Sequence, residues 1–205
     1  SKIDSNFEQE LTEGWGIIGY LHQDSFSPSV MMASLIGNYV ADPNGFGGGY
    51  PNSDLIIMKD EAGSVFWPQF DLNSIGLMQE DKGYQIKMNV TSDFSYPSGS
   101  GRFFDAEPIR TIYYEKAANT GNNMIVGLPL TSWEVMPVIG DEIAAYDELG
   151  RLIGSTTFTG DNVALTIWGD DLTTDAKDGL VIGEKVTFKL WNSDMNTEST
   201  LVVNK

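Results

Sequence analysis

The feature that most constrains this chain is a short pattern that occurs once in each half. Residues 54–65 read DLIIMKDEAGSV, and residues 141–152 read DEIAAYDELGRL. In both copies an apolar run leads into an Asp-Glu-x-Gly turn, in which the glycine can adopt a positive φ, and a second run follows. The pattern predicts a β-hairpin in each half of the chain.

Two flanking segments extend the similarity between the halves. The segment IIG at 17–19 is matched by IVG at 125–127, and IKM at 86–88 is matched by FKL at 188–190. These matches indicate an internal duplication, in which each hairpin lies between an earlier and a later strand. We therefore expect two related modules.

The spacing between matched positions changes along the two copies, and the changes locate insertions. One falls within residues 36–53 of the first copy, and the other falls within residues 168–179 of the second copy. Both are expected to be loops, and loops on a shared framework often carry the binding residues. We expect the modules to span residues 1–104 and 105–205.

Glycine and proline interrupt almost every window of helical period, so strands are expected to dominate. One helix is expected within residues 27–37, because Ser27 can cap it, Pro28 suits its first position and Gly37 can end it. Two runs alternate with the period of a strand, at Tyr84, Ile86 and Met88 and at Val186, Phe188 and Leu190. The predicted fold class is all-β, with two tandem β-sandwich-like modules and one short helix in the first.

Charge limits the partners that the chain can have. It carries 12 basic and 29 acidic residues, a formal net charge of −17. Such a charge repels nucleic-acid phosphates and anionic lipids, so we expect no nucleic-acid partner. No apolar run is long enough to span a bilayer, so we expect no membrane insertion. A basic ligand, a divalent cation or a neutral polymer such as a glycan suits the charge better.

The residue types that most enzymes use for catalysis are scarce. The chain has no cysteine and a single histidine, His22, which makes a zinc site or a Ser-His-Asp triad a poor interpretation. We expect His22 in a surface loop. Two opposed carboxylates could hydrolyse a glycoside, but modules of short strands offer little depth for a substrate cleft. We therefore expect that the protein is not an enzyme.

An acidic loop in the second half is the strongest candidate for a ligand site. Calcium takes about six to eight oxygen ligands, which closely spaced carboxylates, a hydroxyl and free carbonyls can supply. The candidate calcium ligands are Asp170, Asp171, Thr174, Asp175, Asp178 and Glu184. The alternative is an ordinary turn, in which aspartates accept hydrogen bonds from backbone N–H groups and no ion binds.

A glycine-rich loop in the first half is a second candidate. Its glycines would let a ligand approach the backbone closely, with Asp42, Asn44 and Asp54 as polar contacts. Phe46 and Tyr50 would supply aromatic contacts to a partner. The alternative is an insertion without a binding function.

The tryptophans favour a second class of function, because sugar rings stack on exposed aromatic planes. Of the five tryptophans, Trp67, Trp133 and Trp168 are the candidates for such a platform. Most of the five are expected in the core instead.

Several strand and turn motifs carry a resemblance to known proteins. The runs GWGIIG at 14–19 and KGYQIKM at 82–88 resemble a module repeated in large secreted proteins of marine bacteria. The runs WGDD at 168–171 and FKLW at 188–191 resemble its usual companion. The resemblance covers nearly the whole chain and implies an accessory region of adhesins, surface proteins or polysaccharide-acting enzymes. It supplies no catalytic residues.

These observations lead to one favoured function and two alternatives. The favoured function is a non-catalytic extracellular adhesion or structural module, secreted or at the cell surface, that binds a protein, a peptide or a surface partner. The first alternative is a carbohydrate-binding module of a secreted polysaccharide-acting protein. The second alternative is a subunit of a filament or a phage appendage.

Overall fold

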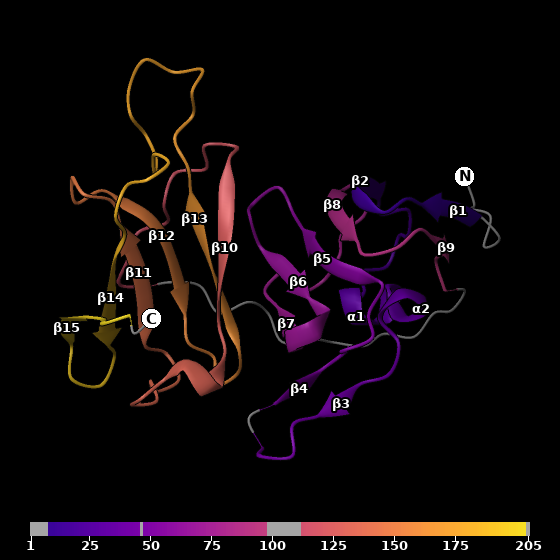
Figure 1. Ribbon diagram of the computed structural model, residues 1–205, viewed down its shortest axis with the longest axis horizontal. Coiled ribbons are helices and arrows are strands. Elements are labelled where there is room, and N and C mark those ends of the chain that lie inside the picture. The colour runs from indigo at the N-terminus through magenta and orange to yellow at the C-terminus, as the bar shows by residue number, and fades with distance from the viewer. Residues whose placement is uncertain (1–7, 46, 98–111, 204–205) are drawn as a thin grey trace. The chain divides into compact units, whose positions relative to one another are not determined.

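The computed structural model describes residues 8–45, 47–97 and 112–203 and divides the chain into two compact units, Ser1–Pro108 and Ile109–Lys205 (Figure 1). The all-β fold is confirmed, because short strands in several antiparallel sheets make up most of the regular structure. The expected boundary between residues 104 and 105 lies outside the described residues. Each unit is described by itself below.

The first unit is built on one five-stranded antiparallel sheet. Its strands, in spatial order, are β2 (Gly14–Gly19), β8 (Gly83–Met88), β5 (Leu55–Lys59), β6 (Val65–Trp67) and β7 (Leu72–Asn73). Two smaller pairs accompany it, β1 (Glu8–Leu11) with β9 (Ser92–Ser95) and β3 (Val40–Ala41) with β4 (Gly48–Gly49). A single 3-10 turn, η1 (Pro68–Phe70), joins β6 to β7.

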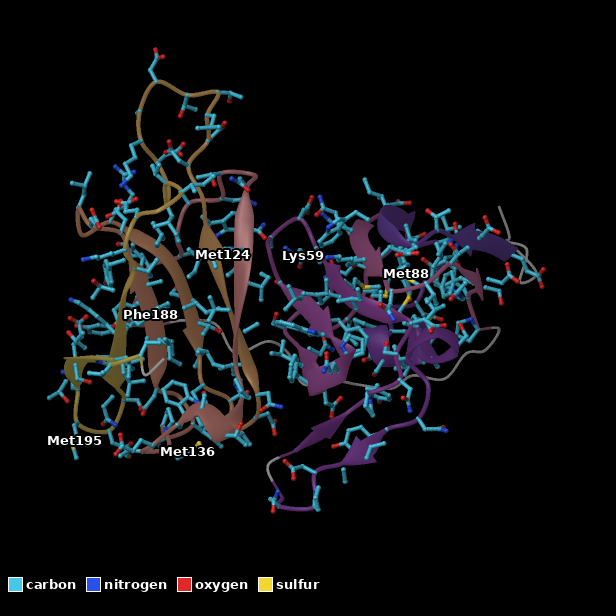
Figure 2. All side chains as sticks on the ribbon, viewed as in Figure 1. Lys59, Met88, Met124, Met136, Phe188 and Met195 are labelled. Carbon is cyan, nitrogen blue, oxygen red and sulfur yellow. The ribbon has the colours of Figure 1, made fainter. Side chains whose placement is uncertain are left out.

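One face of this sheet forms the core of the first unit. The predicted alternation on β8 is confirmed, since Tyr84, Ile86 and Met88 are all buried on that face. Helical residues and the β1–β9 pair cover it, for example through Met32 and Phe94. Figure 2 shows Met88 among the packed side chains of this core.

The helical segment was located correctly, but it forms two single turns instead of one helix. The turns are α1 (Pro28–Met31) and α2 (Ala33–Ile36), and the backbone departs from helical angles at Met32 between them. Ser27 caps the first turn, because its side chain accepts a hydrogen bond from the N–H of Ser29 at 3.3 Å. Gly37 ends the second turn with a φ of 71°, a conformation that glycine adopts without strain.

The second unit has two sheets. One has the order β12 (Leu152–Thr157), β11 (Glu142–Tyr146), β14 (Thr187–Asn192) and β15 (Thr197–Thr200), and the other pairs β10 (Asn123–Leu128) with β13 (Val163–Trp168). A 3-10 turn, η2 (Leu130–Ser132), follows β10. Side chains of both sheets share one core, and the predicted inner face of Val186, Phe188 and Leu190 packs against it (Figure 2).

The predicted hairpins are confirmed, and their turns have matching hydrogen bonds. In the first unit Asp60 accepts N–H bonds through its carboxylate from Ala62 and Ser64, at 2.9 and 2.7 Å. In the second unit Asp147 accepts the same bonds from Leu149 and Arg151, at 3.0 and 2.7 Å. The turn glycines Gly63 and Gly150 have φ values of 82° and 78°. An aspartate that caps its own turn and a glycine with positive φ therefore explain why both sequences fold alike.

The match between later strands is also present in the pairing register. Met58 pairs with Ile86 in the first unit, and Ala145 pairs with Phe188 in the second. The match between earlier strands is wrong. Strand β2, with residues 17–19, pairs with β8, whereas β10, with residues 125–127, pairs with β13 in the other sheet. A three-residue apolar motif does not specify which neighbour a strand takes.

Candidate binding surfaces

The acidic loop between β13 and β14 is closed at its base by two of the predicted calcium ligands. Asp170 accepts an N–H bond from Asp178 at 2.8 Å, and Asp178 accepts one from Asp171 at 2.9 Å. The hydroxyl of Thr174 lies 3.4 Å from the second carboxylate oxygen of Asp178. Figure 1 shows the loop extending beyond the strand ends of its unit, between β13 and the strand labelled β14.

The other predicted ligands do not join this group. Asp171 caps Thr173, and hydrogen bonds from the hydroxyl and N–H of Thr173 hold the pKa of Asp171 below its usual value. Asp175 is exposed, and Glu184 accepts a hydrogen bond from Lys177. Within residues 8–45, 47–97 and 112–203, no group of three or more His, Cys, Asp or Glu side chains could hold a metal. Calcium binding by the loop stays a prediction.

Lys177 binds the acidic loop to the hairpin turn, a contact that the sequence did not reveal. Its ammonium group lies 2.9 Å from the carboxylate of Asp147 and 2.5 Å from that of Glu184. Burial raises the pKa of Asp147, but hydrogen bonds from Lys177 and the N–H groups of Arg151 and Leu149 outweigh it, and the net shift is downward. The only feature of the sequence that could have indicated this contact is Lys177 itself, a single lysine within the acidic run at 170–178.

The glycine-rich loop forms the β3–β4 hairpin, and two of its polar candidates, Asp42 and Asn44, lie together at the tip. The third, Asp54, directly precedes β5 and accepts a hydrogen bond from the hydroxyl of Ser92 at 3.0 Å. Asp42 accepts hydrogen bonds from the N–H and the side-chain amide of Asn44, at 2.8 and 3.2 Å. Tyr50 packs edge-on against Tyr39, with ring centroids 5.5 Å apart. Phe46 lies outside the described residues.

The glycines of this loop bring the chain close to itself. A Cβ on Gly48 would overlap the ring of Tyr39, and a Cβ on Gly49 would overlap the backbone carbonyl of Gln69. Close approach by a ligand was predicted and stays a prediction, and the described groups that approach these glycines belong to the protein. The carbonyl of Pro68 also accepts a hydrogen bond from the N–H of Tyr50 at 2.9 Å, which fixes the hairpin to η1.

The three tryptophans that were candidates for sugar stacking differ in exposure and packing. Trp168 is 4% exposed, whereas sugar stacking requires an accessible plane. Trp133 packs against the core of the second unit edge-on to Phe158. Trp67 is half-buried and packs edge-on to Phe70, with ring centroids 4.8 Å apart. These three side chains come from different segments, and Trp67 belongs to the other unit.

Trp15 is the most exposed of the five tryptophans, and it lies beside an exposed isoleucine on β2, where no site was predicted. Trp15 and Ile17 alternate with the buried Ile18, so both project from the side of the sheet that faces away from the core. Their exposed fractions are 55% and 76%. The ammonium groups of Lys59 and Lys87 lie 5.5 and 5.7 Å from the centroid of the Trp15 ring.

We call these four residues the β2 face. Lys87 is the direct cross-strand neighbour of Trp15, which places its side chain beside the ring. Burial lowers the pKa of Lys59 from its usual value. Two lysines over one tryptophan stand out in a chain with 12 basic and 29 acidic residues. The β2 face therefore combines an exposed apolar pair with two nearby cations.

His22 has a packing role in the structure. It lies in a loop, as expected, and its ring is 5.4 Å from that of Tyr96 and 5.9 Å from that of Phe26. The ring also contacts Tyr20 at a centroid distance of 5.7 Å.

Comparison of the chain with protein-family models, curated proteins and solved structures finds no match. The resemblance to repeated modules of secreted bacterial proteins therefore stays a prediction. In the part of the chain that the structure describes, no helix has the length and apolar character needed to cross a membrane.

Proposed function

We propose that the protein is a non-catalytic extracellular module, secreted or at the cell surface, that binds a protein or peptide partner through the β2 face. The observation that carries the proposal is the exposure of Trp15 and Ile17 side by side on one strand. Tryptophan is among the residues that contribute most to the energy of protein interfaces. Adhesion or structural display is the role that such a module would serve.

The placement of the two lysines favours a protein partner over a sugar. Their ammonium groups already lie over the ring of Trp15, within 6 Å of its centroid. A sugar that stacked on this ring would have to displace them, whereas a carboxylate side chain of a peptide would reach the ammonium group of Lys87 from the rim. Carbohydrate binding is the second candidate, because the ring of Trp15 is more than half exposed.

A screen with two libraries tests the proposal. The full chain is panned against a random-peptide display library and applied to a glycan array, next to the variant Ile17→Glu. Ile182→Glu is the matched control, because Ile182 is fully exposed but lies in the second unit. We expect peptides that bind the unmodified chain and the control but lose binding to Ile17→Glu.

Two results would count against the proposal. Glycan binding that is lost on Trp15→Ala, in the absence of peptide binding, would establish the carbohydrate alternative. Ligands of either kind that bind the Ile17→Glu variant with unchanged affinity would place the binding site elsewhere on the chain.

A further inference from the structure

We infer that β2 binds its partner by strand addition, with an acidic, extended peptide pairing along the outer edge of the strand. The inference rests on the proposed function and adds the conformation and the charge of the partner. Strand β2 is the terminal strand of its five-stranded sheet, with β8 on one side. A terminal strand offers a row of backbone groups that another extended chain can pair with.

The ladder between β2 and β8 determines which backbone groups are already used. Tyr20 donates its N–H to the carbonyl of Lys82 at 2.8 Å, immediately beyond the strand. Hydrogen-bonded pairs alternate in an antiparallel ladder, so Ile18 and Gly16 are bonded to β8 as well. The residues between them direct their backbone groups to the opposite side.

Those outward residues are Trp15, Ile17 and Gly19. A further contact supports this assignment of outward backbone groups, because the carbonyl of Gly19 accepts a hydrogen bond from the hydroxyl of Tyr96, at 2.8 Å, instead of from β8. Among the described residues, no group is hydrogen-bonded to the outward N–H and C=O of Trp15 and Ile17. The open stretch of the edge therefore coincides with the two exposed apolar side chains.

The charge near this stretch indicates the chemistry of the partner. An added strand would place alternate side chains on the same side of the sheet as Trp15 and Ile17. Lys87 lies one strand further away, on β8, but its ammonium group lies over the intervening ring of Trp15, 5.7 Å from the centroid. Acidic side chains at those positions would meet the ammonium group of Lys87. A second copy of this chain is a poorer occupant, because it would bring a net charge of −17 to a chain of the same charge, whereas a short peptide brings only a few negative charges.

The probe for the test is a short peptide that alternates valine and glutamate, at about 0.15 M salt to screen the net charge of the protein. We expect binding to slow the amide hydrogen exchange of Trp15 and Ile17. Exchange at Gly16 and Ile18, which are already bonded to β8, should change little. The same peptide with lysine in place of glutamate should bind roughly fivefold more weakly, because Lys87 repels it locally.

Variants at position 17 separate backbone pairing from side-chain contact. Ile17→Pro removes an outward N–H without removing a bond to β8, as proline does where it occurs naturally on sheet edges. Ile17→Val keeps the N–H and an apolar side chain and is the matched control. We expect the proline variant to lose probe binding and the valine variant to retain it, with circular dichroism showing that both are folded.

The outcomes are distinguishable from failure of the proposed function. If library peptides bind the β2 face but leave exchange at Trp15 and Ile17 unchanged and tolerate Ile17→Pro, the face binds through side chains only and strand addition is wrong. If the valine–glutamate peptide does not bind, or the lysine peptide binds more tightly, the inferred acidic partner is wrong. Concentration-dependent dimerisation that is lost in Ile17→Pro would assign the edge to a second copy.

Discussion

The two units share a scaffold of a hairpin and a later strand but differ in what surrounds it. In the first unit helices and the β1–β9 pair cover the inner face of the sheet, whereas in the second unit the β10–β13 sheet does so. The position beside the later strand is taken by β2 in the first unit and by β15 in the second. The shared parts are held by matching turns, and the differences lie at the faces and edges.

These two outer strands have opposite chemistry. Strand β2 reads GWGIIG and exposes a tryptophan and an isoleucine, whereas β15 reads TEST and exposes only polar residues. A polar, charged strand is a common way to keep a sheet edge from pairing with other chains. Under the proposed function, the edge of the first unit takes the partner, whereas the polar edge of the second unit does not.

A second contrast lies at the first residue of each hairpin. The first unit has Leu55 there, whereas the second has Glu142, which is 1% exposed. The carboxylate of Glu142 accepts N–H bonds from Ile112, Tyr113 and Tyr114, at 2.5, 2.8 and 2.9 Å. It thereby fixes the beginning of the described part of the second unit onto β11.

Exchanging these two residues should give the largest effect. Glu142→Leu leaves three N–H groups without their acceptor, of which that of Tyr114 is buried, and Leu55→Glu buries a carboxylate at a position that is 1% exposed. We expect each change to lower the free energy of unfolding by about 3–5 kcal/mol. Urea denaturation of the full chain, followed by amide exchange to assign the loss to a unit, measures the effect. Equal stability of Glu142→Leu and the unmodified chain would show that the three hydrogen bonds contribute nothing.

Removal of the turn aspartates should have a smaller effect. Asp60→Ala loses two hydrogen bonds to backbone N–H groups, which should lower the free energy of unfolding by about 1–2 kcal/mol. Asp147→Ala should cost more, because the side chain of Asp147 is fully buried and also binds Lys177. Denaturation midpoints of the two variants decide the order. The reverse order would mean that the bond to Lys177 does not stabilise the fold.

Acid should affect the second unit more than the first. The pKa of Asp147 is held below its value of about 3.9 in unfolded chains, so its ionised form stabilises the folded state above that pH. This contribution is lost as the pH falls through the folded-state pKa. Stability followed from about pH 5 to about pH 3 should therefore drop more steeply in the second unit, and less steeply in Asp147→Asn. Identical acid profiles of the variant and the unmodified chain would contradict this assignment.

Calcium should have the smallest effect on stability. Asp170 and Asp178 already accept hydrogen bonds from the loop backbone, so an ion would have to compete with these contacts. Millimolar affinity, typical of weak extracellular sites, corresponds to about 1 kcal/mol of stabilisation at about 10 mM calcium. The melting temperature in calcium and in chelator measures it, with Asp178→Asn as the control. An unchanged melting temperature would leave the loop as a hydrogen-bonded turn.

Local patterns in the sequence predicted the local features of the fold. The hairpins follow from the Asp-Glu-x-Gly turns, the helical turns from Ser27 and Gly37, and the buried side of β8 from its alternation. Each of these depends on residues within a few positions of one another. Which strands pair with one another depends instead on residues far apart in the sequence, and for this reason the match between β2 and β10 is wrong.

The features that were missed depend on contacts between residues far apart in the sequence. Nothing near Glu142 indicates that the N–H groups of residues 112–114 lie around it. Most of the tryptophans were expected in the core, but Trp15 is 55% exposed, because it lies on the side of β2 that faces away from the core. The glycines at 48 and 49 predicted close approach, and only the fold shows that Tyr39 and Gln69 are close to them.

Amide hydrogen exchange in the full chain without any ligand tests most directly whether the edge of β2 is open. We expect fast exchange at Trp15 and Ile17, whose N–H groups point away from β8, and slow exchange at Gly16 and Ile18, which are bonded to it. An alternating pattern of this kind would confirm that the strand is available for a partner. Equal protection at all four amides would show that another segment or a second chain already covers the edge, and would contradict the account.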